Sequence, residues 1–150
     1  MFRLVTRTMF KRSLRAHLRG DADALLRTYS KDVCFRFHGD SSWAGEFHGI
    51  SEVRAWLERF YRVGLRLEID DILIAGWPWN TRIALHFTDH LTGPDGTLVY
   101  ENDGFIYAKA VWGKIHQYEV VEDTQKVSAL DDWLKKYGEN QQNHSGETPL

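Results

Sequence analysis

The hydrophobic pattern changes its period near residue 64, and this change constrains the fold more than any other feature. Before that point, apolar residues recur every three to five positions, as on one face of a helix. After it come four strand-like runs, at residues 65–75, 81–91, 98–108 and 114–121. The breaks between these runs are short, which predicts an antiparallel meander. Helices followed by long strands indicate an α+β fold in which helices cover one face of a cone-shaped, curved antiparallel sheet, enclosing one apolar pocket.

The remaining elements follow from caps and breakers. Gly20 ends a first helix, and Asp21 is a good N-cap for a short second helix before a strand at residues 33–38. Residues 39–49 predict a loop or short hairpin that covers part of the cup. We expect a third helix from Ser51 to Gly64 and a last helix over residues 127–137.

Length and composition predict one domain. The chain has 150 residues, of which 43% are hydrophobic, and a chain of this size buries roughly 68–70% of its unfolded surface. We place the domain at residues 1–137. The tail at residues 138–150 has almost nothing apolar to bury, so we predict that it is disordered.

Charge argues against nucleic acid as a partner. The formal net charge is −2 and the two signs are interspersed, so no broad basic field faces the phosphates. One local exception lies in the first helix, which carries Arg3, Arg7, Lys11, Arg12, Arg15 and Arg19. This row is typical of the solvated face of an amphipathic helix, and the alternative is contact with an anionic membrane or ligand.

Cysteine use and short motifs exclude several classes. Cys34 is the one cysteine, which rules out a disulfide framework and favours a reducing compartment, the cytoplasm. Basic residues interrupt every early apolar run, so we expect no signal peptide and no membrane span. His86 and His90, four apart on a strand, lie about 13 Å from each other, and no metal-binding spacing or phosphate loop is present. We therefore expect no metal and no cofactor.

Several segments together resemble the nuclear transport factor 2-like superfamily. Residues 20–26 read Gly-Asp-Ala-Asp-Ala-Leu-Leu, and Phe47-His48-Gly49-Ile50 precedes the third helix. Residues 100–105 and 121–124 are similar to the closing strands of polyketide-cyclase-like (SnoaL-like) and ketosteroid-isomerase-like members. The resemblance covers roughly residues 10–135. It implies the cone-shaped fold, a pocket for a small molecule and a dimer formed through the outer face of the sheet.

The family's catalytic positions match only in part. The resemblance places Asp103 where ketosteroid isomerases hold a protonated acid that donates to an oxyanion. Their tyrosine position is Ser13 here, and their general-base position is Phe37. In limonene-epoxide-hydrolase-like members an arginine precedes the aspartate by two residues; that position is Glu101 here, and the second aspartate falls on Val120. Steroid isomerisation and epoxide hydrolysis are therefore poorly supported.

Asp123 matches the aspartate that acts as acid and base in polyketide-cyclase-like members. A carboxylate before Thr124 is, however, also typical of a helix cap. His38 follows an aromatic strand and could point into the mouth of the cup, or it could be a hydrogen-bonded structural residue. Both residues are candidate catalytic groups.

Strand register suggests a dyad. If residues 93–96 form a four-residue loop, His86 lies opposite Asp103 on one face, and the carboxylate would raise the pKa of the imidazole. The alternative is a polar pair on the outer face. Ile83, Leu85 and Phe87 occupy the opposite face, and the simplest rule sends apolar residues inward. Following the family resemblance, we place these three outside, in a homodimer interface, and Asp103 inside.

Aromatic side chains are candidates for the substrate-binding wall, although aromatic residues at such spacing also build ordinary cores. They are Trp43, Phe47, Trp56, Phe60, Phe105, Tyr107 and Tyr118.

The leading hypothesis is an isomerase, cyclase or lyase that moves a proton on an apolar, carbonyl-bearing substrate, using Asp103 with His86 or His38. The alternative is a non-catalytic module of the same fold that binds a small ligand or dimerises. The sequence leaves open whether the chain is an enzyme.

Overall fold

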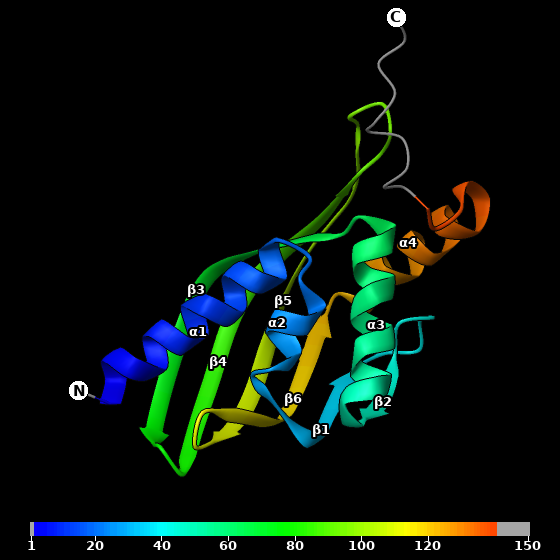
Figure 1. The fold of residues 1–150 in the computed structure, drawn as a ribbon. Helices are drawn as coiled ribbons and strands as arrows, with labels where there is room; N and C mark the ends of the chain where they lie inside the picture. Colours follow the sequence, from blue (N-terminus) through cyan, green and yellow to red (C-terminus); the bar gives the residue numbers. More distant parts are fainter. Residues whose placement is uncertain (1, 141–150) are drawn as a thin grey trace, which may run out of the picture.

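A computed structural model describes residues 2–140 (Figure 1). One mixed sheet of six strands has the order β2-β1-β6-β5-β4-β3. Its strands are β1 Tyr29–Phe37, β2 Gly45–His48, β3 Arg66–Trp77, β4 Asn80–Thr92, β5 Leu98–Val111 and β6 Lys114–Glu122. The helices are α1 Phe2–Leu18, α2 Ala22–Leu26, α3 Gly49–Val63 and α4 Thr124–Tyr137. The fold is therefore the α+β class that the sequence predicts.

The predicted meander is present, with one addition. Strands β3 to β6 pair antiparallel in chain order. Strand β1 lies parallel to β6, and β2 pairs antiparallel with β1 at the sheet edge. The sheet is thus mixed rather than wholly antiparallel, because α3 carries the chain from the β1–β2 edge to the far edge before the meander begins. Figure 1 shows α1, α2 and α3 over one face of the curved sheet.

Helix α3 begins two residues earlier than the sequence predicts. His48 is its N-cap and makes no side-chain cap hydrogen bond; instead, Glu52 in the first turn accepts from the His48 amide at 2.6 Å. A carboxylate here also faces the positive end of the helix dipole. The helix ends at Gly64 as predicted, because that residue adopts the left-handed conformation (φ 91°) that glycine reaches without a steric penalty.

The outward placement of Ile83, Leu85 and Phe87 is wrong. Their side chains are 4%, 6% and 1% exposed, and they face the helices from β4. The inward face of β4 is the apolar one, as the simplest patterning rule states. These three residues are buried within the chain and therefore cannot form the expected homodimer interface.

Helix α4 and the start of the tail are held by specific contacts. The Asp123 carboxylate accepts from the amides of Gln125 (3.0 Å) and Lys126 (3.4 Å) and so caps the helix. Glu139, within the stretch predicted to be disordered, pairs with Arg59 at 2.7 Å. Residues 141–150 of that stretch lie outside the described residues.

Among the four helices described, none has the length and apolar composition needed to cross a membrane.

Removal of the Asp123 cap tests its structural role. We expect Asp123→Ala to lower the free energy of unfolding by about 1 kcal/mol, because two amides of the first turn lose their acceptor. Asp123→Ser retains an acceptor and should lose much less. Urea denaturation measures both variants. Equal stability of the alanine and serine variants would contradict a capping role.

Candidate functional site

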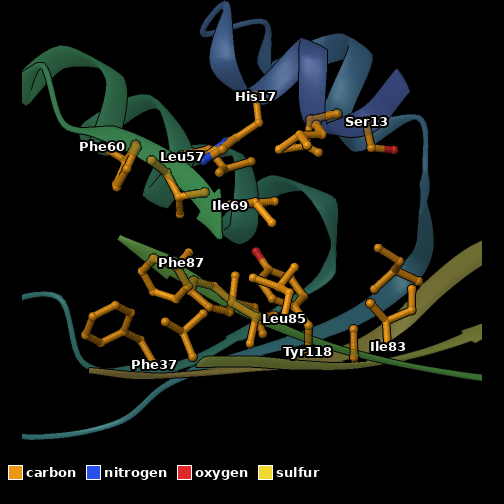
Figure 2. A pocket seen from close by; sticks show the side chains of 18 of the residues that line it. Ser13, His17, Phe37, Leu57, Phe60, Ile69, Ile83, Leu85, Phe87 and Tyr118 are labelled. Carbon is orange, nitrogen blue, oxygen red and sulfur yellow. The ribbon is translucent and has the colours of Figure 1, made fainter. Parts of the chain in front are cut away.

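The main cavity lies between the helices and the inner face of the sheet. Its volume is about 120 Å³. Figure 2 shows Ser13 and His17 on α1 facing the strand residues across it. The wall is almost wholly apolar, with a few polar groups at separate points, which is the usual character of a small-molecule site. The apolar lining includes Leu14, Leu25, Phe35, Phe37, Trp56, Leu57, Phe60, Leu67, Ile69, Ile83, Leu85, Phe87, Ile106 and Val120.

Two tyrosines form one polar point of this wall. The side chains of Tyr29 and Tyr118 are hydrogen-bonded to each other, with ring centroids 5.3 Å apart. Burial raises the pKa of Tyr29 to about 12 and also raises that of Tyr118. Both hydroxyls therefore stay protonated at neutral pH, and the pair can donate a hydrogen bond to a ligand oxygen.

A second polar point is His17, near the C-terminal end of α1. Its Nδ1 lies 2.8 Å from the Tyr61 hydroxyl. Burial lowers the pKa of His17 to about 4, so the imidazole is neutral at pH 7. A neutral ring can donate or accept one hydrogen bond without placing a charge in the apolar pocket.

The third polar point is a pair of acidic side chains at the end of the cup nearest α4. Burial, followed by the charge of Glu122, raises the pKa of Asp89 to about 8. Burial likewise raises the pKa of Glu122 to about 7, partly opposed by hydrogen bonds from Tyr100 and Asn102. When Glu122 ionises, its charge adds to burial in keeping the neighbouring Asp89 protonated near neutral pH.

Strand register brings the groups of this pair together. Asp89 lies directly opposite Asn102 across β4 and β5. Glu122 accepts from the Tyr100 hydroxyl at 3.0 Å and from the Asn102 amide nitrogen at 3.3 Å. The same Asn102 nitrogen donates to the Asp123 carbonyl at 3.0 Å, which fixes the amide. Asn102 is 1% exposed, so its hydrogen bonds are shielded from solvent.

Asp89 is less well satisfied. Its side chain is 3% exposed, yet its Oδ1 has no hydrogen-bond partner among the described residues. Asp89 lines a small cavity of about 20 Å³ that shares Phe37, Trp56 and Glu122 with the main pocket. An unsatisfied buried carboxyl oxygen is costly for folding, which is a reason to look for a function there.

Gly104 makes room for this arrangement. A Cβ at this position would lie 2.4 Å from the Val121 carbonyl oxygen, 2.8 Å from the Glu122 side chain and 2.9 Å from the Phe87 ring. Any larger residue would push the carboxylate and the ring away from their places. The glycine therefore lets Glu122 and Phe87 pack against the middle of β5.

The predicted dyad lies on the other side of the sheet. His86 pairs in register with Phe105, and Asp103 with Thr88, two residues from the expected register. One residue of the shift arises because Thr92 pairs with Leu98 instead of Thr97, and the bulge between Leu91 and Thr92 adds the second. The imidazole still reaches Asp103 at 3.6 Å and Asp70 at 3.1 Å. The Asp103 side chain is 62% exposed. Its inward placement is wrong, and Asn102 occupies the inward position on this strand.

His38 and Asp123 also lie away from the pocket wall. His38 contacts Glu119 at 3.3 Å, with about a third of each side chain exposed. Asp123 is the cap of α4. None of the four predicted catalytic residues lines the main cavity, and their catalytic roles stay predictions. Asp89 and Glu122 were missed, although Asp89 continues the alternating row Ile83, Leu85 and Phe87.

The predicted aromatic wall is divided. Trp56, Phe60 and Tyr118 line the main cavity. Trp43 lines the small cavity instead, with the Arg59 guanidinium 3.9 Å from its ring centroid. The other three do not line either cavity. Phe47 stacks on the back of Phe35, whereas Phe105 and Tyr107 are 61% and 44% exposed on the outer face.

One cluster of metal-ligand types occurs among the described residues. Ligand atoms of Cys34, Glu46 and His48 lie within 4.8 Å of one another. The three residues sit on β1 and β2 at the sheet edge, and none of them lines the main cavity. The cluster is separate from the pocket chemistry.

Comparison with known proteins agrees with the fold described above. Residues 10–118 match the profile described as SnoaL-like domain. The chain belongs to this family. A search of curated proteins found no match.

Solved structures with the same fold are similar over most of their length. An NTF2-like protein of unknown function from Burkholderia pseudomallei has a TM-score of 0.71 and 21% identity over 84% of this chain and 96% of its own. A proposed polyketide cyclase from Xanthomonas campestris pv. campestris has a TM-score of 0.61 and 17% identity over 82% and 96%. TerC, crystallised with polyporic acid, has a TM-score of 0.65 and 18% identity over 81% and 97%. At these identities the likeness shows the fold alone.

The raised pKa of Asp89 predicts a pH-dependent stability effect. Unfolding exposes the carboxyl, which then ionises above about pH 4, whereas the folded carboxyl keeps its proton up to about pH 8. This group therefore costs increasing stability as the pH rises between these values. We expect Asp89→Asn to match the wild type near pH 4 and to exceed it by at least about 1 kcal/mol near pH 8.

Urea denaturation at both pH values measures this difference. Asp103→Asn is the matched control, since the same substitution on the exposed outer face should stay within about 0.5 kcal/mol at either pH. An Asp89→Asn effect that does not grow with pH would contradict a protonated buried Asp89.

Proposed function

We propose that the chain is an acid–base enzyme that transfers a proton on a small, apolar, carbonyl-bearing molecule, with Glu122 and Asp89 as the proton-transfer pair. The observation that carries this proposal is a pair of carboxyls with raised pKa at the edge of an apolar cavity. A carboxyl whose pKa lies near the working pH is an efficient general acid or base. The isomerase, cyclase or lyase class expected from the sequence is retained, with different residues.

The two carboxyls have different parts in this proposal. Glu122 lines the main cavity and is the group that meets the substrate. In its ionised form it removes a proton from the carbon next to the carbonyl. Asp89 does not line the main cavity; it keeps its proton when Glu122 ionises, because its own burial and the charge of Glu122 both raise its pKa. The basicity of Glu122 comes from its burial. Tyr100 and Asn102 hold Glu122 in one orientation.

The substrate's oxygen would be held by neutral donors. The Tyr29–Tyr118 pair, His17 and Ser13 are the polar groups elsewhere on the wall, and none of them is charged at pH 7. Donors of this kind stabilise negative charge that develops on an oxygen during proton removal. A substrate with a charged group inside the pocket would meet no counter-charge at these points.

Cavity size limits the substrate class. A cavity of about 150 Å³ in another protein binds benzene, and this one is about 120 Å³. The enclosed part of the substrate is therefore of monocyclic size. Among the relatives, one is a proposed polyketide cyclase and one was crystallised with polyporic acid, which agrees with a pocket for small organic molecules.

A non-catalytic binding module is the second candidate. It is favoured by the apolar nature of almost the whole wall, because binding alone needs no proton-transfer group. The two candidates differ in whether Glu122 is needed for turnover or only present at the pocket edge.

Hydrogen exchange separates them. We expect the wild type to catalyse exchange of α-protons for deuterium in monocyclic ketones, followed by proton NMR, with a rate that rises with pH through about 7. Glu122→Gln should lose at least about 100-fold in exchange while the ketone's Kd changes by less than about threefold. Glu119→Gln, on the outer face of the same strand, is the control. Ketone binding with no exchange above buffer in the wild type would support the module.

We place the expected homodimer interface on a different surface, the outer face of the sheet. The outer face carries exposed Phe105 (61%), Tyr107 (44%), Val121 (47%) and Leu73 (68%), and neighbouring strands place them side by side. We expect light scattering to give twice the 17.5 kDa chain mass, and Phe105→Glu with Val121→Glu to give monomers, because two charges would enter an apolar contact. A wild-type monomer at micromolar concentration would contradict this surface.

A further inference from the structure

Two hairpin turns place three tryptophans together at one end of the sheet. Trp77 and Trp79 flank the β3–β4 turn, and Trp112 lies in the β5–β6 turn. We call these three residues the tryptophan tip. In Figure 1 both turns lie at the lower end of the sheet, opposite the β4–β5 loop. The three side chains are 65%, 54% and 69% exposed.

The tip is an ordered structure rather than a set of loose side chains. The rings of Trp77 and Trp79 are stacked, with centroids 5.7 Å apart and an interplanar angle of 6°. Trp112 lies 6.0 Å from Trp79. The Trp112 amide donates to the Pro78 carbonyl at 2.6 Å, which ties the two turns to each other. The cluster therefore presents one continuous aromatic surface to solvent.

Trp112 is held in a conformation that folding alone does not favour. Its φ is 50°, and among the described residues it is the one non-glycine residue with positive φ. It forms, with Gly113 (φ 79°), the two-residue turn between the paired Val111 and Lys114. Such turns prefer asparagine, aspartate or glycine at the first position, and a bulky residue there is strained. An exposed, strained tryptophan points to a role outside folding.

Charge around the tip has one sign. Residues 72–88 and 104–118, which form the two hairpin ends, contain no aspartate or glutamate but carry Arg82, Lys109 and Lys114. Acidic side chains from outside these segments pair with them at two histidines: Asp32 lies 3.6 Å from His116, and Asp70 and Asp103 lie 3.1 Å and 3.6 Å from His86. Both histidines lie on the strands and not in the two turns. Helix α1 runs alongside β3 in Figure 1 and begins toward this end.

We propose that the tryptophan tip docks the protein on a membrane surface that contains anionic lipids. Tryptophan favours the headgroup region of a bilayer, where its ring is half apolar and its N–H is solvated. Nearby lysines and arginines are attracted to anionic headgroups. The match between a protruding aromatic cluster and a surrounding cationic rim is the feature that selects this partner.

Other occupants fit less well. A second copy docked tip to tip would bring Arg82, Lys109 and Lys114 against themselves, which costs free energy. Single-stranded nucleic acid is bound by aromatic residues along a basic groove, whereas these rings protrude from turns and two of them stack on each other. Both occupants are outcomes of the experiment below.

Sedimentation with sucrose-loaded vesicles tests the proposal. We expect the full chain to bind phosphatidylcholine vesicles that contain about 30 mol % phosphatidylserine at least tenfold more tightly than phosphatidylcholine alone, with weaker binding as salt increases. Lys109→Gln should weaken binding about fivefold, as expected for one cation near the surface. Equal binding to both vesicle types would overturn the charge argument.

Trp112→Asn separates docking from folding. Asparagine suits the turn, so we expect unchanged or higher thermal stability together with at least a tenfold loss of vesicle binding. Trp79→Ser is a second variant with the same expected loss. Leu98→Ser, an exposed apolar residue (55%) beside the β4–β5 loop at the other end of the sheet, should bind like the wild type. Ketone exchange should be unchanged in all of these variants.

Three results would overturn the proposal. Vesicle binding that Trp112→Asn and Trp79→Ser leave intact would show that the tip is not the contact. A change in oligomeric state on Trp112→Asn, measured by light scattering, would assign the tip to a second copy. Tight binding of a single-stranded oligonucleotide that the two tryptophan variants abolish, with no vesicle binding, would assign it to nucleic acid.

Discussion

The alternation of side chains along β4 is the constraint on which the rest of the structure depends. Because successive residues of a strand point to opposite faces, Ile83, Leu85 and Phe87 form the floor of the cavity, and the same row continues to Asp89. A carboxyl within such an apolar row, here between Phe87 and Leu91, is kept from bulk water, so its pKa rises. Packing and acid–base chemistry thus come from one periodic pattern.

Much of the fold could be predicted from sequence because its signals are local. The change of period at residue 64, the glycine that ends α3 and the short turns of the meander each act within a few residues. The parallel pairing of β1 with β6 could not be predicted, since it depends on how α3 carries the chain from one edge of the sheet to the other. The pairing of Thr92 with Leu98 and the bulge beside it were equally invisible, and together they moved the partner of Asp103 by two positions.

The two acidic residues of the proposed site were missed in the sequence for a different reason. The patterning rule alone sends Ile83, Leu85 and Phe87 inward, and extending it by one step would have found Asp89. The family resemblance favoured Asp103 instead, and it assigned the wrong face of the sheet to the pocket. At this place on β5 the side chain that points inward is that of the adjacent Asn102. Glu122 carries the same signal on β6, where it follows Tyr118 and Val120 at alternate positions. For the inward face of β4 and β5, the local patterning rule was correct and the aligned motif was not.

The cost of the buried pair also shows why the rest of the cup is built as it is. Two carboxyls with raised pKa oppose folding at neutral pH, and one oxygen of Asp89 has no partner among the described residues. The large aromatic and aliphatic core around them offsets that cost, because burying each such side chain stabilises the fold by about 1.5–3 kcal/mol. If the pair had no function, asparagine and glutamine at these two positions would remove the charge penalty while keeping similar shapes. Acids at both positions, with glycine at position 104 so that Glu122 can approach, therefore fit the proposed transfer of a proton at the pocket edge.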